Sequence, residues 1–280
     1  MTAPVPSSPQ TTPLTIEVWS DVVCPWCYIG KRRLESAMAQ IEARGTELDD
    51  VQIRWRSFQL DPSAPRPGEH GHGLAVAEHL GHKYGGGIEA GRAMSAQVTQ
   101  VAAGDGLDFR LEDARVGNTV DAHRLLHLAA NLEDEDREDD KDHEGRGDGA
   151  SANLQDRLKE RLLKAYFTQG LDVSDHAVLQ DLAVEVGLPQ SRVDEVVGST
   201  AYQREVQQDQ AQAQAYGATG VPFTVVDGRY GVSGAQPVEV FVDTIERAIA
   251  DRAPQLITAS ASADASAEAT QCGPEGCEVP

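Results

Sequence analysis

The feature that most constrains the fold of this chain is the run Cys24-Pro25-Trp26-Cys27. An apolar run from Leu14 to Val18 precedes it and predicts a strand. After it, Leu34, Met38 and Ile41 form an apolar stripe at helical spacing. The two cysteines are therefore expected where a strand gives way to a helix.

This location matters because a thiolate attacks disulfides and a thiol does not. An ordinary thiol, with a pKa near 8.5, is only a few per cent ionised at neutral pH. Pro25 suits the first position of a helix, where its missing N–H costs nothing. The unpaired N–H groups of that first turn favour an anion at Cys24. We therefore expect Cys24 to attack a disulfide, and Cys27, one turn into the helix, to resolve the mixed disulfide.

A second strand is predicted over 51–60, where apolar and polar residues alternate. A strand, a helix and a strand in this order predict two parallel strands. The Pro/Gly-rich segment 61–73 then marks a boundary, and apolar residues recur at helical spacing beyond it. The predicted helices cover 74–84, 88–103, 119–132, 153–167, 175–186, 190–197 and 202–216.

Local signals refine these helices. Ser174 is predicted to cap the helix at 175–186, and Thr200 with Gln203 has the spacing of a capping box. Gly187 and Gly217 stand where glycine stops helices.

An acidic segment interrupts the helical region. Residues 133–148 hold ten acidic and three basic side chains and almost nothing apolar. We expect a disordered surface loop over 133–152.

The pattern changes again after Gly217. Two short apolar runs, 223–226 and 229–232, flank Asp227-Gly228, which is a strong hairpin signal. An amphipathic helix is predicted over 238–249. The order βαβ, helices, ββα predicts an α/β, thioredoxin-like fold with a large all-helical domain inserted between the two halves.

The predicted organisation therefore has four parts. Residues 1–13 form a disordered leader, and residues 14–66 and 217–252 together form the thioredoxin-like domain. Residues 67–216 form the inserted helical domain. Residues 253–280, which include an Ala/Ser-rich tether, form a flexible tail.

Four motifs in this order resemble the DsbA family, and within it the FrnE-like branch. They are SDVVCPWCYIGKRRLE, GNTVDAHRLLHLA, LKERLLKAYFTQG and GATGVPFTVVDGRYGVSGAQPVEVF. The resemblance implies protein dithiol–disulfide exchange, with Cys24 as the exposed nucleophile and Cys27 as its buried partner. It also implies that Val221-Pro222 is a cis-proline turn facing the two cysteines. The Val221 backbone would then pair with an extended substrate, which would also contact Pro25 and Trp26.

The tail carries the remaining cysteines, Cys272 and Cys277, separated by Gly, Pro, Glu and Gly. On a mobile tether this pair could close a disulfide and exchange electrons with Cys24 and Cys27. Binding of adventitious metal, or no role, remains an alternative for it.

Two rival functions stay open. A zinc-binding or chaperone-like module would use both cysteine pairs as a four-thiolate site. A glutathione-dependent transferase or isomerase, of the kappa-class or chromene-carboxylate isomerase type, would bind glutathione near Ser233. Those relatives generally replace the nucleophilic cysteine by serine, and retention of both cysteines favours disulfide exchange.

The histidines divide into two groups. His70, His72, His79 and His82 have spacings that could suit a metal, although solvated polar residues at a domain junction are the preferred interpretation. His123 and His127 are expected to serve packing and capping.

Composition limits the partners. The formal net charge of −21 argues against nucleic acid and anionic membranes. No apolar stretch approaches the ~20 residues of a membrane span, and the first residues lack the features of a signal peptide. We expect a cytoplasmic protein that needs no cofactor or metal. Its partners would be cysteine-containing proteins, with glutathione or a thioredoxin-type protein as reductant.

Overall fold

The computed structural model describes residues 13–48, 51–141 and 153–252, except the side chains of 139–141. The predicted leader, the tail with Cys272 and Cys277, and residues 142–152 of the acidic segment lie outside these ranges, apart from Pro13.

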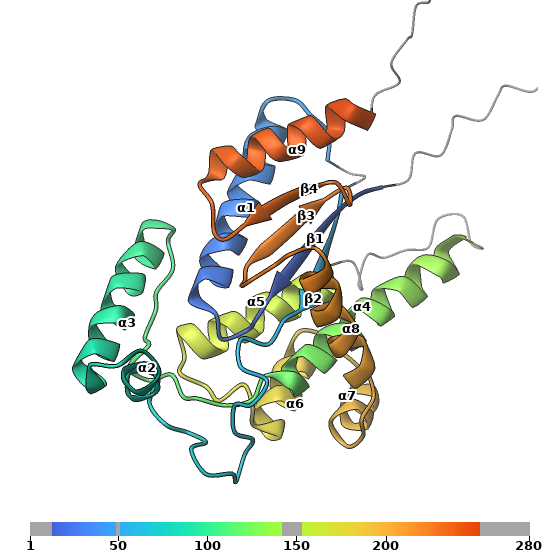
Figure 1. The fold of residues 1–280 in the computed structure, drawn as a ribbon. Helices are drawn as coiled ribbons and strands as arrows, with labels where there is room; N and C mark the ends of the chain where they lie inside the picture. The colour runs from blue at the N-terminus through green and yellow to red at the C-terminus, as the bar shows by residue number, and fades with distance from the viewer. Residues whose placement is uncertain (1–12, 49–50, 142–152, 253–280) are drawn as a thin grey trace, which may run out of the picture.

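A four-stranded mixed sheet is assembled from both ends of the described chain (Figure 1). Its order is β2-β1-β3-β4. The strands are β1 (Leu14–Ser20), β2 (Val51–Ser57), β3 (Phe223–Val226) and β4 (Tyr230–Ser233). The predicted parallel pairing of β1 with β2 is confirmed, and β3 pairs antiparallel with both β1 and β4.

The hairpin between β3 and β4 turns at Asp227 and Gly228, as predicted. Their φ angles are 57° and 63°. The loop has three residues, 227–229, and the N–H of Arg229 donates to the carbonyl oxygen of Val226 at 3.1 Å, which closes a turn whose two central residues both have positive φ.

Strand β2 ends three residues earlier than predicted, because backbone N–H groups at its end and beyond it donate hydrogen bonds to side chains. The N–H of Ser57 donates to Asp209 Oδ2 at 2.8 Å, and that of Leu60 donates to Asp21 Oδ2 at 2.8 Å. The N–H of Gln59 donates to the side-chain amide oxygen of Gln210 at 3.2 Å, so from Ser57 on these N–H groups bond to side chains rather than to a neighbouring strand.

Helices α1 (Pro25–Ala43) and α9 (Val238–Arg252) cover one face of the sheet (Figure 1). Between them and the strands lies an apolar core. It includes Ile16, Leu34, Ile41, Trp55, Phe241 and Ile245.

The remaining helices lie between β2 and β3 in the chain. They are α2 (Val76–Tyr84), α3 (Gly87–Gly104), α4 (Val120–Lys141), α5 (Leu154–Phe167), α6 (His176–Glu185), α7 (Gln190–Val197) and α8 (Gln203–Ala215). Helices α2 and α3 form a pair that stands apart from α4–α8 (Figure 1). The predicted α/β architecture with helices inserted between βαβ and ββα halves is confirmed.

The prediction of a loop over 133–152 is wrong for residues 133–141, where α4 continues. Two arginines, one distant in the chain and one within the helix, pair with acidic side chains of residues 133–141. Arg54 of β2 pairs with Glu133 and Asp134, and Arg137 pairs with the same two carboxylates. Glu133 also accepts the N–H of Gln155 at 2.6 Å, which joins α4 to the start of α5.

Two predicted caps are wrong. Asp175 rather than Ser174 caps α6, with its carboxylate accepting the N–H of Val178. Ser174 instead donates to Asp172 at 2.6 Å. The capping box before α8 does not form, because Tyr202 is the N-cap residue, with a φ of 62° and no side-chain capping bond.

Gly187 and Gly217 adopt φ angles of 107° and 78° just after α6 and α8, which confirms their predicted role.

Candidate active site

Cys24 is the N-cap residue of α1, and Pro25 begins the helix. The backbone of Cys24 is extended, and its side chain makes no capping bond to the helix. Its thiol instead lies 3.6 Å from the carbonyl oxygen of Val221, to which it donates. A thiolate at this position would face the unpaired N–H groups of the first helical turn.

The resemblance implied an exposed nucleophile, and this expectation is wrong for the structure. Cys24 is only 3% exposed, since the chain before Pro222 covers it. The side chain still borders a cavity, so a substrate sulfur can approach it from there.

Cys27 lies one turn into α1 and is 1% exposed. Both cysteines are free thiols. Burial raises the pKa of Cys27 well above that of an ordinary thiol, and the hydrogen bond and charge of Cys24 raise it further. The charge of Lys159 acts in the opposite direction. Cys27 therefore stays protonated while Cys24 faces the cavity, which is the arrangement a nucleophile and a resolving thiol need.

The Val221-Pro222 peptide bond is cis, as the resemblance implied. Pro222 lies against α1: a Cβ atom added to Gly30 would lie 3.0 Å from the Cγ atom of Pro222. The absence of a side chain at Gly30 therefore allows this turn to approach the helix that carries both cysteines.

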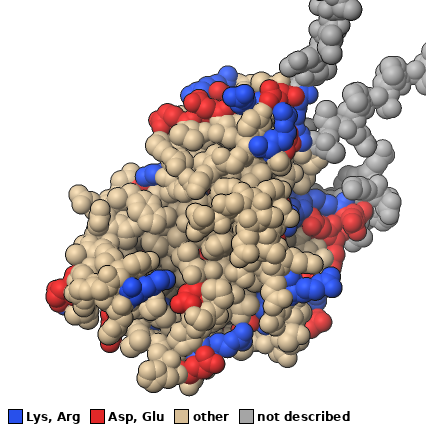
Figure 2. All heavy atoms as spheres, in the orientation of Figure 1, with Lys and Arg blue, Asp and Glu red and all other residues tan. Residues whose placement is uncertain are grey.

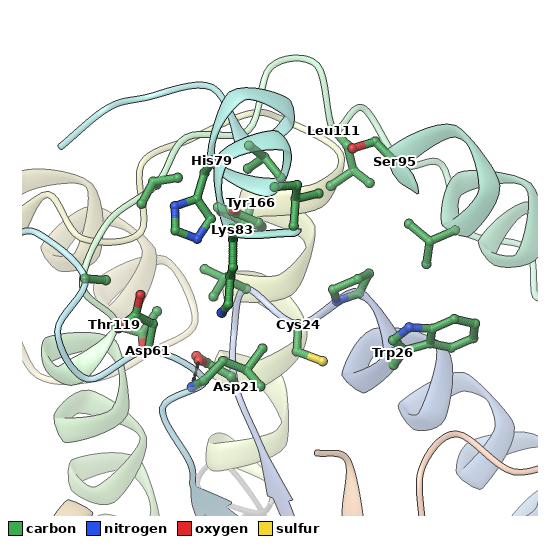
Figure 3. A pocket seen from close by; sticks show the side chains of 18 of the residues that line it. Asp21, Cys24, Trp26, Asp61, His79, Lys83, Ser95, Leu111, Thr119 and Tyr166 are labelled. Carbon is green, nitrogen blue, oxygen red and sulfur yellow. Dashed lines mark hydrogen bonds between the residues drawn. The ribbon is translucent and has the colours of Figure 1, made fainter. Parts of the chain in front are cut away.

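A cavity of about 420 Å³ opens beside Cys24. Helices α2 and α3 supply an apolar wall that includes Val76, Leu80, Met94 and Val98. Figure 3 shows Lys83 extending from α2 toward the turn that carries Asp21, with Trp26 on the other side of Cys24.

The surface around the mouth is apolar as well. Trp26 is 43% exposed, and Leu60 and Tyr84 are also exposed. On the face shown in Figure 2, Lys, Arg, Asp and Glu lie mainly toward the edges, and the middle carries few charges. Acidic side chains are therefore not concentrated in the middle of this face.

A cluster of buried polar side chains lies beneath the cysteines. Asp21 accepts a hydrogen bond from Leu60 N at 2.8 Å, and its Oδ1 lies 3.2 Å from His123 Nε2. Lys159 is fully buried and donates to the carbonyl oxygen of Ser20 at 3.4 Å. These groups come from the β1–α1 turn, from α4 and from α5.

Electrostatics keep the members of this cluster in defined states. Burial alone would raise the pKa of Asp21, but His123, the Leu60 N–H and the charge of Lys159 outweigh it and lower this pKa. Burial lowers the pKa of His123, so the imidazole is neutral at neutral pH. Burial also lowers the pKa of Lys159, to about 8.

The structure brings together some predicted site residues and separates others. Pro25, Trp26 and Val221 line the cavity with Cys24. Ser233, proposed for glutathione binding, is the last residue of β4 and is exposed, and neither it nor Pro222 borders the cavity. Cys272 and Cys277 lie outside the described residues.

The histidines have specific partners. His123 contacts Asp21, three residues before Cys24, rather than serving only for packing. His79 borders the cavity, and His72 lies 2.9 Å from Asp172. Within the described part of the chain, no three His, Cys, Asp or Glu residues are placed to hold a metal ion.

Sequence reasoning missed Asp21, Lys159 and Tyr166, the last of which borders the cavity. Lys159 gave one weak signal: it lies four positions after Gln155 and four before Leu163, and both of these are buried. The hydrophobic stripe of α5 thus includes a lysine. Its neighbours could not be named without the fold.

Comparisons with known proteins agree with this geometry. A model of the DSBA-like thioredoxin domain family matches residues 15–141 and 149–246. The crystal structure of a probable DsbA oxidoreductase, SCO1869 from Streptomyces coelicolor, is 36% identical and has a TM-score of 0.70. The match covers 95% of this chain and 99% of the SCO1869 chain. This chain therefore belongs to the DSBA-like thioredoxin domain family.

Two further proteins are more distant. The uncharacterized protein YwbO of Bacillus subtilis is 28% identical over 240 residues, which is 84% of this chain and 96% of that protein. The cytosolic disulfide reductase DsbM of Pseudomonas aeruginosa, solved with GSH, shares the fold at a TM-score of 0.51 and 16% identity. The match covers 85% of this chain and 96% of DsbM. No helix among residues 13–48, 51–141 and 153–252 has the length and hydrophobicity to cross a bilayer.

Proposed function

We propose that this protein is a thiol–disulfide oxidoreductase or isomerase of the FrnE-like branch, acting on disulfides of other proteins in the cytoplasm. One observation carries the proposal: the Cys24 thiol lies at the N-terminus of α1, beside an apolar cavity, with the buried Cys27 thiol one turn behind it. Membership of a family with DsbA oxidoreductases supports it.

The reaction has two displacement steps. The Cys24 thiolate attacks one sulfur of a substrate disulfide, and the other substrate sulfur leaves as a thiolate and takes a proton from solvent. Cys27 then attacks the Sγ atom of Cys24, which breaks the mixed disulfide and forms the Cys24–Cys27 disulfide. The substrate gains two electrons and two protons, and the enzyme dithiol loses them. The reverse sequence oxidises a substrate dithiol.

The two residues between the cysteines, Pro25 and Trp26, serve substrate contact in this proposal. Both border the cavity, and Val221 offers backbone for an extended peptide, with the adjoining cis-Pro222 fixing that turn. The tail pair, Cys272 and Cys277, is proposed as an electron shuttle to the active-site dithiol.

A second candidate is a glutathione-dependent transferase or isomerase. The DsbM structure contains GSH, which favours glutathione as reductant or co-substrate of this fold. Because Ser233 does not border the cavity, the geometry gives that candidate less support than disulfide exchange. Among the described residues no group of His, Cys, Asp or Glu is placed to hold a zinc ion, and Cys272 and Cys277, the other half of the four-thiolate site, lie outside them.

Refolding of scrambled ribonuclease distinguishes these functions. We expect the full chain to restore ribonuclease activity in a glutathione buffer, and Cys24→Ser to restore none above the buffer alone. A chain ending at Gln271 should still isomerise disulfides. It should lose the electron transfer from Cys272 and Cys277 that returns the active-site cysteines to the dithiol form. If the shortened chain returns its active-site cysteines to the dithiol form as fast as the full chain, the shuttle is contradicted. Glutathione binding without any refolding of ribonuclease would favour the transferase.

A further inference from the structure

Two basic side chains of α2 border the cavity beside Cys24. His79 and Lys83 lie four positions apart, and therefore on one face of the helix. In Figure 3 Lys83 extends from α2 toward the turn that carries Asp21, whereas Trp26 lies on the other side of Cys24. The nucleophile thus lies between a basic and an apolar part of the cavity lining.

Neither of these basic side chains has an acidic partner. Among the residues that the structure describes, no carboxylate lies within ion-pair distance of His79 or Lys83. Lys83 contacts only the ring of Tyr84, with its Nζ atom 5.8 Å from the ring centre. His82 on the same helix, by contrast, lies 3.9 Å from Glu78. The two cavity-facing groups are therefore available to an incoming anion.

The carboxylates that border the same cavity are already engaged. Asp21 accepts the N–H of Leu60 at 2.8 Å and lies 3.2 Å from His123. Asp61 accepts the N–H of Ser63 at 3.0 Å and its hydroxyl at 2.6 Å. These hydrogen bonds hold both carboxylates away from the basic pair of α2.

Two buried hydroxyl groups also border the cavity. Thr119 lies just before α4 and is 3% exposed, and Tyr166 of α5 is 4% exposed. Neither hydroxyl has a hydrogen-bond partner in the described part of the chain. Buried polar groups normally have one, so a ligand in the cavity is a natural acceptor for them.

We propose that this part of the cavity binds the carboxylate of an Asp or Glu residue next to the substrate cysteine that Cys24 attacks. Lys83 supplies the charge, and His79, Thr119 and Tyr166 supply further hydrogen-bond donors. This inference rests on the proposed disulfide exchange and names a substrate class for it, namely proteins whose disulfide cysteine has an acidic neighbour.

The dimensions and exposure of the cavity suit this ligand. Its volume of about 420 Å³ is that of a small-ligand site, in which a mostly apolar lining carries a few convergent polar groups. Lys83 is exposed, so it can attract an anion from solvent. The hydroxyls are buried, so they bind it where water competes less.

The test compares peptides joined through a disulfide that carry Glu, Gln or Lys on both sides of the cysteine. Their kcat/KM for reduction, with a dithiol reductant supplied, is divided by the rate with the reductant alone. This ratio removes the effect of the flanking charge on the disulfide itself. The unaltered chain should prefer Glu to Gln about three- to tenfold, and the preference should shrink as salt is raised.

Changing Lys83 tests the charge. Lys83→Met should remove the preference for Glu, and Lys83→Glu should make the Lys peptide the best of the three. Arg92→Met is the control, because it removes an exposed positive charge from α3 that pairs with Glu89 and does not border the cavity. It should leave the preference intact. Equal losses in Arg92→Met and Lys83→Met would overturn the proposal.

Tyr166→Phe tests the buried hydroxyl while keeping the ring that packs against Phe167. The preference for Glu over Gln should fall at least about twofold, because a charged acceptor forms roughly twice as strong a hydrogen bond as a neutral one. A merely structural role would lower the unfolding temperature and leave the preference unchanged. An unchanged preference in Lys83→Met or in Tyr166→Phe would overturn the proposal.

Glutathione disulfide, which carries carboxylates of its own, distinguishes a small ligand from a protein. A dependence on Lys83 that appears with glutathione disulfide but with none of the peptides would overturn the assignment to a protein residue. Equal normalised rates for all three peptides would overturn the acidic-neighbour preference alone. The proposed function fails separately, if no peptide is reduced faster than by the reductant alone.

Discussion

Replacing Cys27 with serine should trap the protein as a mixed disulfide between Cys24 and its substrate and slow turnover by about 10³-fold or more. Cys27 lies one helical turn behind Cys24 and attacks within the same molecule. Effective molarities of well-placed intramolecular groups reach ~10⁵ M and above, far beyond any millimolar external thiol. The adduct should be visible by mass spectrometry of the protein incubated with a disulfide-containing peptide.

Cys24→Ser is the matched control, because it leaves a single thiol in the same helix. Cys27 is 1% exposed and its pKa is raised by burial, so this variant should form no adduct at Cys27 on the same timescale. An adduct that forms as fast on Cys27 as on Cys24 would show that the two roles have been assigned the wrong way round.

A Gly91→Ala substitution should separate α2 from α3 and destroy the apolar wall of the cavity. A Cβ atom at Gly91 would lie 1.8 Å from the carbonyl oxygen of Ala77, which is backbone and cannot turn aside. We expect a loss of about 1–3 kcal/mol or more in the local stability of this helix pair. Hydrogen exchange of the amides in α2 and α3 measures that loss, and the KM for a peptide disulfide should rise.

Gly104→Ala tests whether any added methyl group has this effect. Gly104 ends the same helix, but a Cβ atom there meets nothing within 4 Å. Alanine should change stability by less than about 1 kcal/mol and leave KM unaltered. If Gly91→Ala behaves like Gly104→Ala, α2 and α3 do not pack as the structure shows.

Sequence signals within a few residues were sufficient to predict the strands β1 and β2, the β3–β4 hairpin and the start of α1. Alternating apolar residues predicted β1 and β2, and Asp227-Gly228 predicted the hairpin because few other residue pairs accept two positive φ angles. Pro25 and the apolar stripe behind it placed Cys24 at the start of α1. In each case the deciding interaction lies within a few residues of the signal.

The errors occur where a distant partner decides the outcome. Helix α4 continues past Leu132 because Arg54, on a strand nearly 80 residues earlier, pairs with Glu133 and Asp134. β2 ends at Ser57 because Asp209 of α8 accepts its N–H. Neither partner could be identified from residues near the affected segment.

The same reasoning explains what was missed at the site. Both cysteines and the Val221-Pro222 turn were predicted, since motifs carry them. Exposure of Cys24 was predicted wrongly, because a segment almost 200 residues away covers it. The cluster of Asp21, His123 and Lys159 combines a turn and two inserted helices, and only the assembled fold brings these three side chains together.

Reduction of insulin tests the central claim most directly, because it requires Cys24 to attack a disulfide in another protein. With a dithiol reductant supplied, the unaltered chain should accelerate precipitation of the insulin B chain well beyond the reductant alone. Cys24→Ser, checked for an unchanged fold by circular dichroism, should give the rate of the reductant alone. A Cys24→Ser protein as active as the unaltered chain would contradict the account.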